Sequence, residues 1–229
     1  MAAVTAAGDV KLLGLWASPF VMRARIALKI KSIEYEYQEE DLSNKSELLL
    51  NSNPVHKAVP VLIHRGRPVS ESLVIIQYLD EVWPSEPQIL PADPFHRARA
   101  RFWASFVDEK WGPATRSILL TAEGEERKKR IEESREALGV LEEAFINGGG
   151  KFFGGESLGL VDIAAGSIVP WARVIGEIAG VNLIDGIKNP HLHDWARRFT
   201  SDSAVEDLSP EHRALAAYAD KVFPKIATK

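Results

Sequence analysis

The chain has no cysteine among its 229 residues, and that absence excludes several kinds of chemistry. Disulfides, thiolate metal sites, cysteine nucleophiles and redox CxxC pairs all require this side chain. Any sulfur chemistry that the protein performs must therefore use the sulfur of a ligand. The redox state of the compartment stays open, because a cysteine-free chain tolerates either one.

Long apolar runs and an excess of one charge are also missing. No stretch approaches the ~18 apolar residues of a membrane span, and the Ala-rich first residues lack the basic region and apolar run of a signal peptide. The 28 basic and 32 acidic side chains give a net charge of −4, which provides no general attraction to nucleic acid or anionic membranes. We therefore expect a soluble, cytoplasmic protein with neither nucleic acid nor membrane as a partner.

The first third of the chain alternates strand and helix patterns, judged by apolar periodicity and turn residues. One crossover between parallel strands, followed by a hairpin, would give a small mixed sheet with helices on its faces. The predicted elements are a strand over 10–16, a helix over 18–31, a strand over 33–38, a loop with one helical turn over 42–53, a hairpin over 59–64 and 67–69, and a helix over 70–82.

The remainder of the chain is helical in pattern. Prolines crowd residues 84–94, which is typical of a linker. Beyond it we predict about five helices and no strand, with helix starts at Asp93-Pro94, Asn189-Pro190 and Ser209-Pro210 and a capping box from Gly159 to Asp162. The expected domains are an α/β domain over 1–84, a linker over 85–94 and an all-helical domain over 95–229.

Ser18 lies between the first predicted strand and the first predicted helix. A hydroxyl there sits at a helix N-terminus, where backbone N–H groups and the helix dipole favour a negative charge. The alternative is an ordinary N-cap, since three other helices also begin with a capping residue and proline. Local sequence leaves both interpretations open.

Two further pairs are candidate ligand-binding positions. Proline is disfavoured inside a strand, so Val59-Pro60 indicates either an edge strand or a cis bond that turns the Val59 backbone toward a ligand. At Glu71-Ser72 we expect Ser72 to cap the buried helix, with amides that could hold a carboxylate and with Glu71 available to an ammonium group. Capping alone is the alternative there.

Other polar or aromatic features have simpler explanations. Lys45 and His56-Lys57 are most often solvated charges. His191 and His193 face apart on a helix, so we predict no metal site. The basic run 127–130 is flanked by glutamates and indicates a solvated helix face rather than a nucleic-acid patch. The tryptophans of the helical part are by default core residues, namely Trp103, Trp111, Trp171 and Trp195.

Along the chain, a serine follows the first strand, then come a strand proline, an acid-serine pair at a helix start and an all-helical domain. Features in this order resemble those of the soluble glutathione transferases, and among them the plant tau class. The resemblance covers nearly the whole chain. It is carried by Trp16–Val21, Asn44–Leu49, Asn53–Lys57, Val59–Leu62, Glu71–Leu79, Arg101–Ala104, Phe153–Gly155 and Gly159–Ile163. It implies a thioredoxin-like first domain, a helical second domain, a homodimer and glutathione as cosubstrate.

The resemblance also implies roles for single residues. Ser18 would be the catalytic hydroxyl that hydrogen-bonds the glutathione sulfur. Val59 would pair with the cysteinyl backbone beside cis Pro60, while Glu71 and Ser72 would hold the γ-glutamyl ammonium and carboxylate.

The glycyl carboxylate of glutathione would face Lys45. Tau sequences commonly carry a second basic residue just before Val-Pro, where this chain has Ala58. Help from Lys57 or His56, and weaker glutathione binding, are the resulting hypotheses.

By the same resemblance, the electrophile pocket lies between the domains and is lined by Phe20, Arg116, Leu119 and Trp171. Gly112 stands where relatives often carry an aromatic residue, which would open the pocket to bulkier substrates. Tyr218 and Phe223 would cap it from the last helix.

The implied activity is conjugation of the glutathione thiolate to apolar electrophiles, as in xenobiotic detoxification, with reduction of organic hydroperoxides as a side activity. A non-catalytic carrier of apolar ligands on the same fold is the alternative, and an interaction protein with a vestigial site is a third. The absence of cysteine excludes thiol transfer through a protein-bound disulfide.

Overall fold

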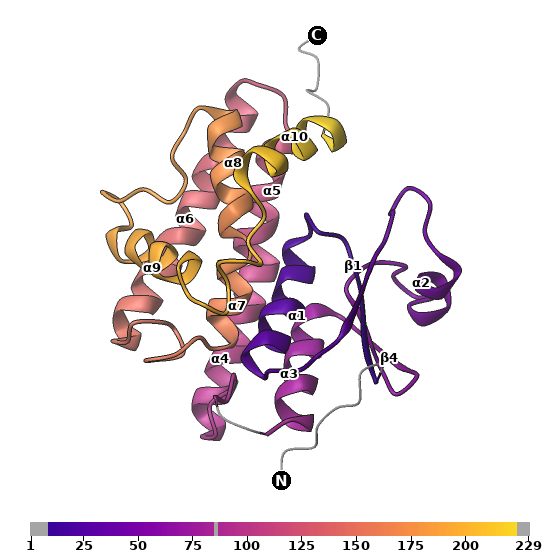
Figure 1. Ribbon diagram of the computed structural model, residues 1–229. Coiled ribbons are helices and arrows are strands. Elements are labelled where there is room, and N and C mark those ends of the chain that lie inside the picture. The colour runs from indigo at the N-terminus through magenta and orange to yellow at the C-terminus, as the bar shows by residue number, and fades with distance from the viewer. Residues whose placement is uncertain (1–8, 85–86, 224–229) are drawn as a thin grey trace. The chain divides into compact units, whose positions relative to one another are not determined.

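A computed structural model describes residues 9–84 and 87–223, and its contacts divide the chain into two units, Met1–Pro91 and Ala92–Lys229 (Figure 1). The predicted linker over 85–94 spans this division, and its residues 85 and 86 lie outside the described residues. Each unit contains the type of secondary structure that the sequence predicts for it.

The first unit is an α/β unit with a mixed four-stranded sheet. Its strands lie in the order β2-β1-β3-β4, with β1 parallel to β2 and antiparallel to β3, and with β3 antiparallel to β4. The elements are β1 (Val10–Gly14), α1 (Pro19–Ile30), β2 (Glu36–Glu39), α2 (Glu47–Ser52), β3 (Val61–His64), β4 (Arg67–Ser70) and α3 (Ser72–Val82). The predicted crossover and hairpin are confirmed.

Both faces of this sheet are covered by helices. Side chains alternate between the two faces along each strand, so each strand contributes buried residues to both. Leu13 is opposite Val61, and these two buried residues pack with Leu49 of α2. The next pair along the strands, Leu12 and Leu62, is fully buried and points to the other face. Helices α1 and α3 cover that other face, so the sheet has helices on both sides (Figure 1).

The second strand is shorter than its sequence pattern. Alternation predicts a strand from residue 33, but β2 begins at Glu36. The Ile33 N–H donates to Leu28 O of α1 at 2.9 Å, and the Ile33 side chain is buried. Ile33 therefore completes the end of α1 instead of pairing in the sheet, which accounts for the wrong boundary.

The second unit is helical. The prediction of about five helices is wrong, since its described residues contain seven α-helices, α4 to α10, and a π-helical turn, η1. The elements are α4 (Pro94–Phe106), η1 (Val107–Trp111), α5 (Gly112–Leu120), α6 (Glu125–Gly148), α7 (Leu160–Gly166), α8 (Val169–Ala179), α9 (Pro190–Thr200) and α10 (His212–Val222). Short interruptions inside long apolar patterns, at η1 and between α7 and α8, account for the difference.

Of the four predicted helix starts, three are confirmed and one is wrong. Asp93 Oδ1 accepts the His96 N–H at 2.9 Å, and Gly159 N–H donates to Asp162 Oδ2 at 2.9 Å in the predicted capping box. Helix α10, however, begins at His212 and is capped by Glu211. Ser209 is still hydrogen-bonded to the preceding turn through its N–H, so Ser209-Pro210 does not begin the helix.

Helix α9 begins after Asn189 as predicted, although the Asn189 side chain makes no capping hydrogen bond. A buried carboxylate of α6 does so instead. Glu142 accepts the backbone N–H groups of His191 and Leu192 at 2.9 and 2.8 Å and contacts the His191 ring at 2.7 Å. His191 thus serves the packing of α6 against α9.

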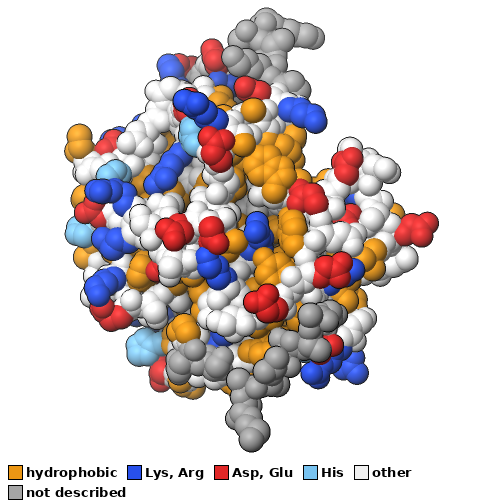
Figure 2. All heavy atoms as spheres, in the orientation of Figure 1, with side chains coloured by type: hydrophobic (Ala, Val, Ile, Leu, Met, Phe, Trp, Pro, Cys, Tyr) orange, Lys and Arg blue, Asp and Glu red, His pale blue; other side chains and the backbone are white. Residues whose placement is uncertain are grey.

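The basic run over 127–130 lies near the start of α6 among acidic partners. Lys128 pairs with Glu125 at 2.6 Å, and Arg130 pairs with Glu126 at 2.6 Å and with Glu133 at 2.9 Å. Figure 2 likewise shows acidic and basic side chains interspersed over the visible face of the helical unit. Of the helices within residues 9–84 and 87–223, none is both long enough and apolar enough to cross a bilayer.

Candidate functional site

The register of the sheet brings the candidate residues of the first unit to one edge. Leu13 near the end of β1 is opposite Val61 at the start of β3, and Val61 is opposite Ser70 at the end of β4. Gly14 pairs with Glu39 at the end of β2. The four loops at these strand ends therefore meet at the same edge, and they hold Ser18, Lys45, Val59-Pro60 and Glu71-Ser72.

Ser18 is the N-cap of α1, with an extended backbone (φ −79°, ψ 122°). Its Oγ accepts the Val21 N–H at 3.4 Å, a long capping bond. A hydroxyl can accept two hydrogen bonds and donate one. The capping role and a donor role toward an anion are therefore compatible at Ser18, although the sequence presented them as alternatives.

The Val59-Pro60 bond is cis. Val59 is half-buried against the Leu13, Leu49 and Val61 cluster. Within the described part of the chain, the Val59 N–H and C=O have no hydrogen-bond partner. A backbone donor and acceptor at the sheet edge are thus available to the backbone of a peptide-like ligand.

A folded turn precedes this bond. Asn53 organises the turn, because its side chain donates to Ala58 O at 2.9 Å and accepts the His56 N–H at 3.1 Å. The Lys57 backbone adopts a left-handed conformation (φ 51°), and its side chain is exposed. The turn thus sets the position of the residues just before the cis bond.

Lys45 lies in a loop that a buried carboxylate braces. Glu40, only 3% exposed, accepts Ser46 Oγ–H at 2.7 Å and the Ser46 N–H at 3.2 Å. The Lys45 side chain has no ion pair among the residues that the structure describes. A cation is thereby placed after β2, at the edge where the other candidates gather.

Glu71 and Ser72 differ from the prediction in one respect. Glu71, not Ser72, is the N-cap of α3, and it holds a left-handed conformation (φ 73°, ψ 117°). Its exposed carboxylate lies 3.7 Å from His56 Nε2. The structure therefore places His56 beside Glu71, although the sequence suggested help for Lys45. Ser72 is the first residue of α3, and it is buried.

Arg23 was missed from the sequence. It is fully buried in α1, its Nη1–H donates to Ser72 Oγ at 3.2 Å, and its guanidinium carbon lies 5.0 Å from the centre of the Phe20 ring. The available signal was a charged residue among the apolar positions of a buried helix. Arg23 connects the start of α3 to α1, where Ser18 lies.

The expected electrophile-binding residues divide between the two units. Phe20 lies on α1 and is 44% exposed. In the helical unit, the Trp171 ring on α8 packs edge-on against Tyr218 and Phe223, with centroids 6.3 and 6.1 Å apart, and the Arg116 guanidinium lies 6.0 Å from the Phe223 ring. The structure therefore clusters these four, while Leu119 lies half-buried on α5.

Gly112 begins α5 directly after the π-helical turn. A Cβ at this position would lie 3.1 Å from Val107 O and 3.3 Å from Ile168 Cδ1. Both distances are tighter than ordinary van der Waals contact, so a side chain would require its neighbours to move. Close packing is therefore a reason for glycine here, beside the wider pocket that the sequence suggested.

The tryptophans of the helical unit are not equally buried. Trp111 and Trp195 are core residues, as expected, whereas Trp103 and Trp171 are half-buried. Within the described residues, no group of three or more His, Asp or Glu side chains could hold a metal ion.

Comparison with known proteins identifies the family. The model for the glutathione S-transferase N-terminal domain matches residues 8–81, and that for the C-terminal domain matches residues 124–198. The chain belongs to the glutathione S-transferase family. Glutathione S-transferase U17 of Arabidopsis thaliana is 49% identical over 96% of this chain and 98% of its own length.

Solved structures agree with this assignment. The tau class glutathione S-transferase of mango, Mangifera indica, is 50% identical with a TM-score of 0.91, covering 95% of this chain and 100% of that one. Rice GST1, solved in complex with glutathione, is 40% identical with a TM-score of 0.88, covering 96% and 98%. The thioredoxin-like first domain and helical second domain are confirmed, and the chain is a glutathione transferase with glutathione as cosubstrate.

Proposed function

We propose that the protein conjugates the thiolate of glutathione to small apolar electrophiles and that Ser18 is its catalytic residue. The observation that carries this proposal is the position of Ser18, at a helix N-terminus and at the sheet edge where the Val59 backbone is unpaired. The comparisons favour the enzyme over a carrier on the same fold, since the relatives are named as transferases.

Ser18 acts on the charge of the sulfur. A free thiol has a pKa near 8.5 and is mostly protonated at neutral pH, while the thiolate is the nucleophile. Lowering this pKa by about two units takes ~2.7 kcal/mol of differential stabilisation. A hydrogen bond from Ser18 Oγ–H to the anion, together with the N-terminus of α1, supplies an effect of that size. The thiol proton goes to solvent, and Ser18 forms no covalent bond.

The other candidates hold the tripeptide around the sulfur. The Val59 N–H and C=O bind the cysteinyl backbone beside Pro60. Glu71 and Ser72 bind the γ-glutamyl ammonium and carboxylate, and Lys45, with Lys57 nearby in sequence, faces the glycyl carboxylate. Arg23 positions Ser72 through its 3.2 Å hydrogen bond. Holding both reactants in one site then provides the effective concentration for reaction.

In the reaction, the sulfur forms a bond to an electrophilic carbon and the leaving group departs. We assign the apolar reactant to Phe20, Arg116, Leu119 and Trp171. Aromatic and aliphatic walls discriminate weakly between apolar compounds, which supports a broad specificity suited to detoxification. As a side activity, the thiolate attacks the terminal oxygen of an organic hydroperoxide, the O–O bond breaks, and the alcohol leaves with glutathione sulfenic acid as the other product. The thiol of a second glutathione then attacks the sulfenic sulfur, which gives the disulfide and water.

The test is conjugation of glutathione to a chloro-nitroarene. Ser18→Ala should lower kcat/KM roughly 10- to 100-fold, because a hydrogen bond to a charged group contributes about 1.5–3 kcal/mol. Glutathione binding, measured by calorimetry, should remain. The control is Asp93→Ala, which removes a capping residue before proline at α4 and should leave kcat/KM unchanged. Full activity in Ser18→Ala would refute the assignment, and failure of the native chain to bind glutathione would favour a vestigial site.

The resemblance also supports a homodimer that acts in the cytoplasm. The domain over 1–84 would bind glutathione, and the domain over 95–229, after the linker over 85–94, would bind the electrophile. Light scattering at several protein concentrations measures the mass of the particle, which should be twice the 25.3 kDa of one chain.

A further inference from the structure

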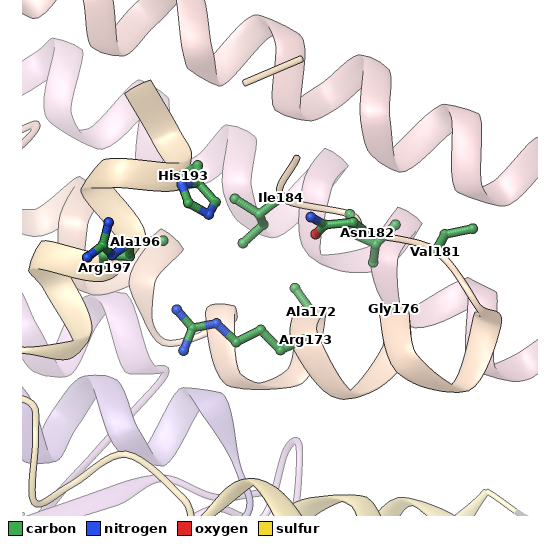
Figure 3. Close-up of a pocket in the computed structure, with 10 residues that line it drawn as sticks. Ala172, Arg173, Gly176, Val181, Asn182, Ile184, His193, Ala196 and Arg197 are labelled. Atoms are coloured by element: carbon green, nitrogen blue, oxygen red, sulfur yellow. The ribbon is translucent and has the colours of Figure 1, made fainter. Parts of the chain in front are cut away.

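A pocket in the helical unit is lined by none of the residues assigned above to glutathione or to the electrophile. It has a volume of about 130 Å³ and is formed by α8, by the segment that follows it and by α9 (Figure 3). Its polar lining consists of Arg173, Asn182, His193 and Arg197. None of its ten lining residues, all of them within the described chain, is acidic.

The backbone around the pocket is built by the end of α8. Gly180 is left-handed (φ 67°), and the Val181 N–H donates to Gly176 O at 2.8 Å, which turns the chain back over the helix. A Cβ on Gly176 would lie only 2.6 Å from Val181 O, so this close return requires glycine. The returning segment carries Asn182 and Ile184 into the pocket wall.

Two guanidinium groups from different helices approach this pocket. Arg173 extends from α8 toward α9, which contributes His193 and Arg197 (Figure 3). His193 and Arg197 are four residues apart and therefore share one face of α9. Among the described residues, the side chains of Arg173 and Arg197 have neither a hydrogen-bond nor an ion-pair partner. Both arginines are exposed, so each guanidinium also contacts solvent. Loss of part of its hydration still lowers the pKa of Arg173.

Of the two nearby carboxylates, one lies beside a pocket residue and the other is held by the backbone. Asp194 Oδ1 lies 3.6 Å from His193 Nδ1, and its side chain is 62% exposed. Asp185 follows Ile184, but its Oδ1 accepts the Ile187 N–H at 2.7 Å. The chain as a whole is acidic, with a net charge of −4, so this cationic cluster is a local feature.

We propose that this pocket binds the phosphate or carboxylate group of a small organic anion. Guanidinium forks match both groups through paired hydrogen bonds, and the Asn182 amide supplies a further donor. A volume of about 130 Å³ suits the anionic group and a few attached atoms. Ala172, Leu183, Ile184 and Ala196 supply an apolar wall for those atoms.

Calorimetric titration of the full chain without glutathione tests the proposal, with inorganic phosphate and acetate as separate probes and with chloride at matched ionic strength. Arg173→Gln and Arg197→Gln should each raise the Kd of the bound probe about tenfold, a loss of about 1.4 kcal/mol. Arg213→Gln, on the exposed face of α10, removes the same charge and should leave Kd unchanged. The probe that binds more tightly identifies the preferred anionic group.

Three results would overturn the proposal: no binding of either probe, binding that survives in both pocket variants, or equal weakening in Arg213→Gln. Conjugation of glutathione by the variants reports on the other site and should equal that of the native chain. Anion titration therefore tests this proposal, and glutathione conjugation tests the proposed function, so the failure of one can be distinguished from the failure of the other. Circular dichroism of each variant, before titration, verifies that the helices are intact.

Discussion

The starts of α1 and α7, one in each unit, use a polar side chain in opposite ways. Asp162 in the first turn of α7 is fully buried and accepts hydrogen bonds from Phe153, Gly154 and Gly159 N–H and from Trp195 Nε1, each at 2.8 or 2.9 Å. Ser18 at the start of α1 accepts one backbone N–H, at 3.4 Å. One group is saturated by its own chain, and the other keeps hydrogen-bonding capacity.

This difference separates polar groups that hold the fold from polar groups that serve a ligand. A buried carboxylate with several donors stabilises the fold because losing it strands those donors. A hydroxyl with a single long bond contributes little to folding but can still donate to an anion. The comparison predicts that substitution at Asp162 acts mainly on stability and substitution at Ser18 mainly on catalysis.

The largest effect is expected at Asp162. Asp162→Asn should lower the free energy of unfolding by about 3 kcal/mol or more, because an amide nitrogen then faces buried N–H donors. Denaturant unfolding measures the change. Asp220→Asn, an exposed position on α10, is the matched control and should change stability little. Equal stability of the two variants would contradict the assignment of Asp162 to the stability of the fold.

The same variant carries a pH prediction. Burial raises the pKa of Asp162 to about 6, above its value in the unfolded chain. At a pH between the unfolded pKa of 3.8 and the folded pKa of about 6, Asp162 is protonated in the folded chain but not in the unfolded chain. The stabilisation that this protonation provides is therefore fully present at acidic pH and is lost as pH rises through about 6. The stability difference between the native chain and Asp162→Asn should shrink over that interval, and a constant difference would contradict the shift.

At Ser18 the pattern should reverse. Ser18→Ala should cost less than about 0.5 kcal/mol of stability, below the usual ~1 kcal/mol for a lost N-cap, because its capping bond is long. The pH at which kcat/KM reaches half its maximum should rise, since the sulfur loses a donor. Asp93→Ala should show the opposite result, with reduced stability and an unchanged pH profile. A stability loss at Ser18 equal to that at Asp93 would mean that Ser18 is an ordinary cap.

An intermediate case is Arg23, which is buried and also borders the site. Arg23→Met should raise KM for glutathione about tenfold with a smaller change in kcat, since a hydrogen bond to a charged group contributes about 1.5–3 kcal/mol. Arg23→Lys should recover part of the binding, because it restores the charge without the fork. Loss of stability with an unchanged KM would assign Arg23 to the fold alone.

The smallest effect is expected at Ala58, which is exposed and whose carbonyl is held by Asn53. Ala58→Lys should lower KM for glutathione by up to about fivefold, in line with the 0.2–1 kcal/mol of an exposed ion pair. Ala58→Gln gives a side chain of similar length without the charge and should have no effect. A KM that does not fall in Ala58→Lys would count against weak glycyl binding in the native chain.

Much of the first unit could be predicted from its sequence because period-two alternation and turn residues report on local structure. The positions of Ser18, Val59-Pro60 and Glu71 were visible in this way. Arg23 was not assigned, since its partner Ser72 lies 49 residues away and only the packing of α1 against α3 brings them together. The extra helices of the second unit were missed because the interruptions at η1 and between α7 and α8 are short and lie inside long helical patterns.

By itself, the amino-acid sequence determined the class of chemistry and its sulfur source. A chain without cysteine must take any reactive sulfur from a ligand. The resemblance of its motifs to those of the glutathione transferases identifies glutathione as that ligand. Tertiary structure decided how the polar groups are used. Strand register set which loops meet at one edge, and burial determined whether a side chain such as Asp162 is saturated internally or, like Ser18, retains a donor for a ligand.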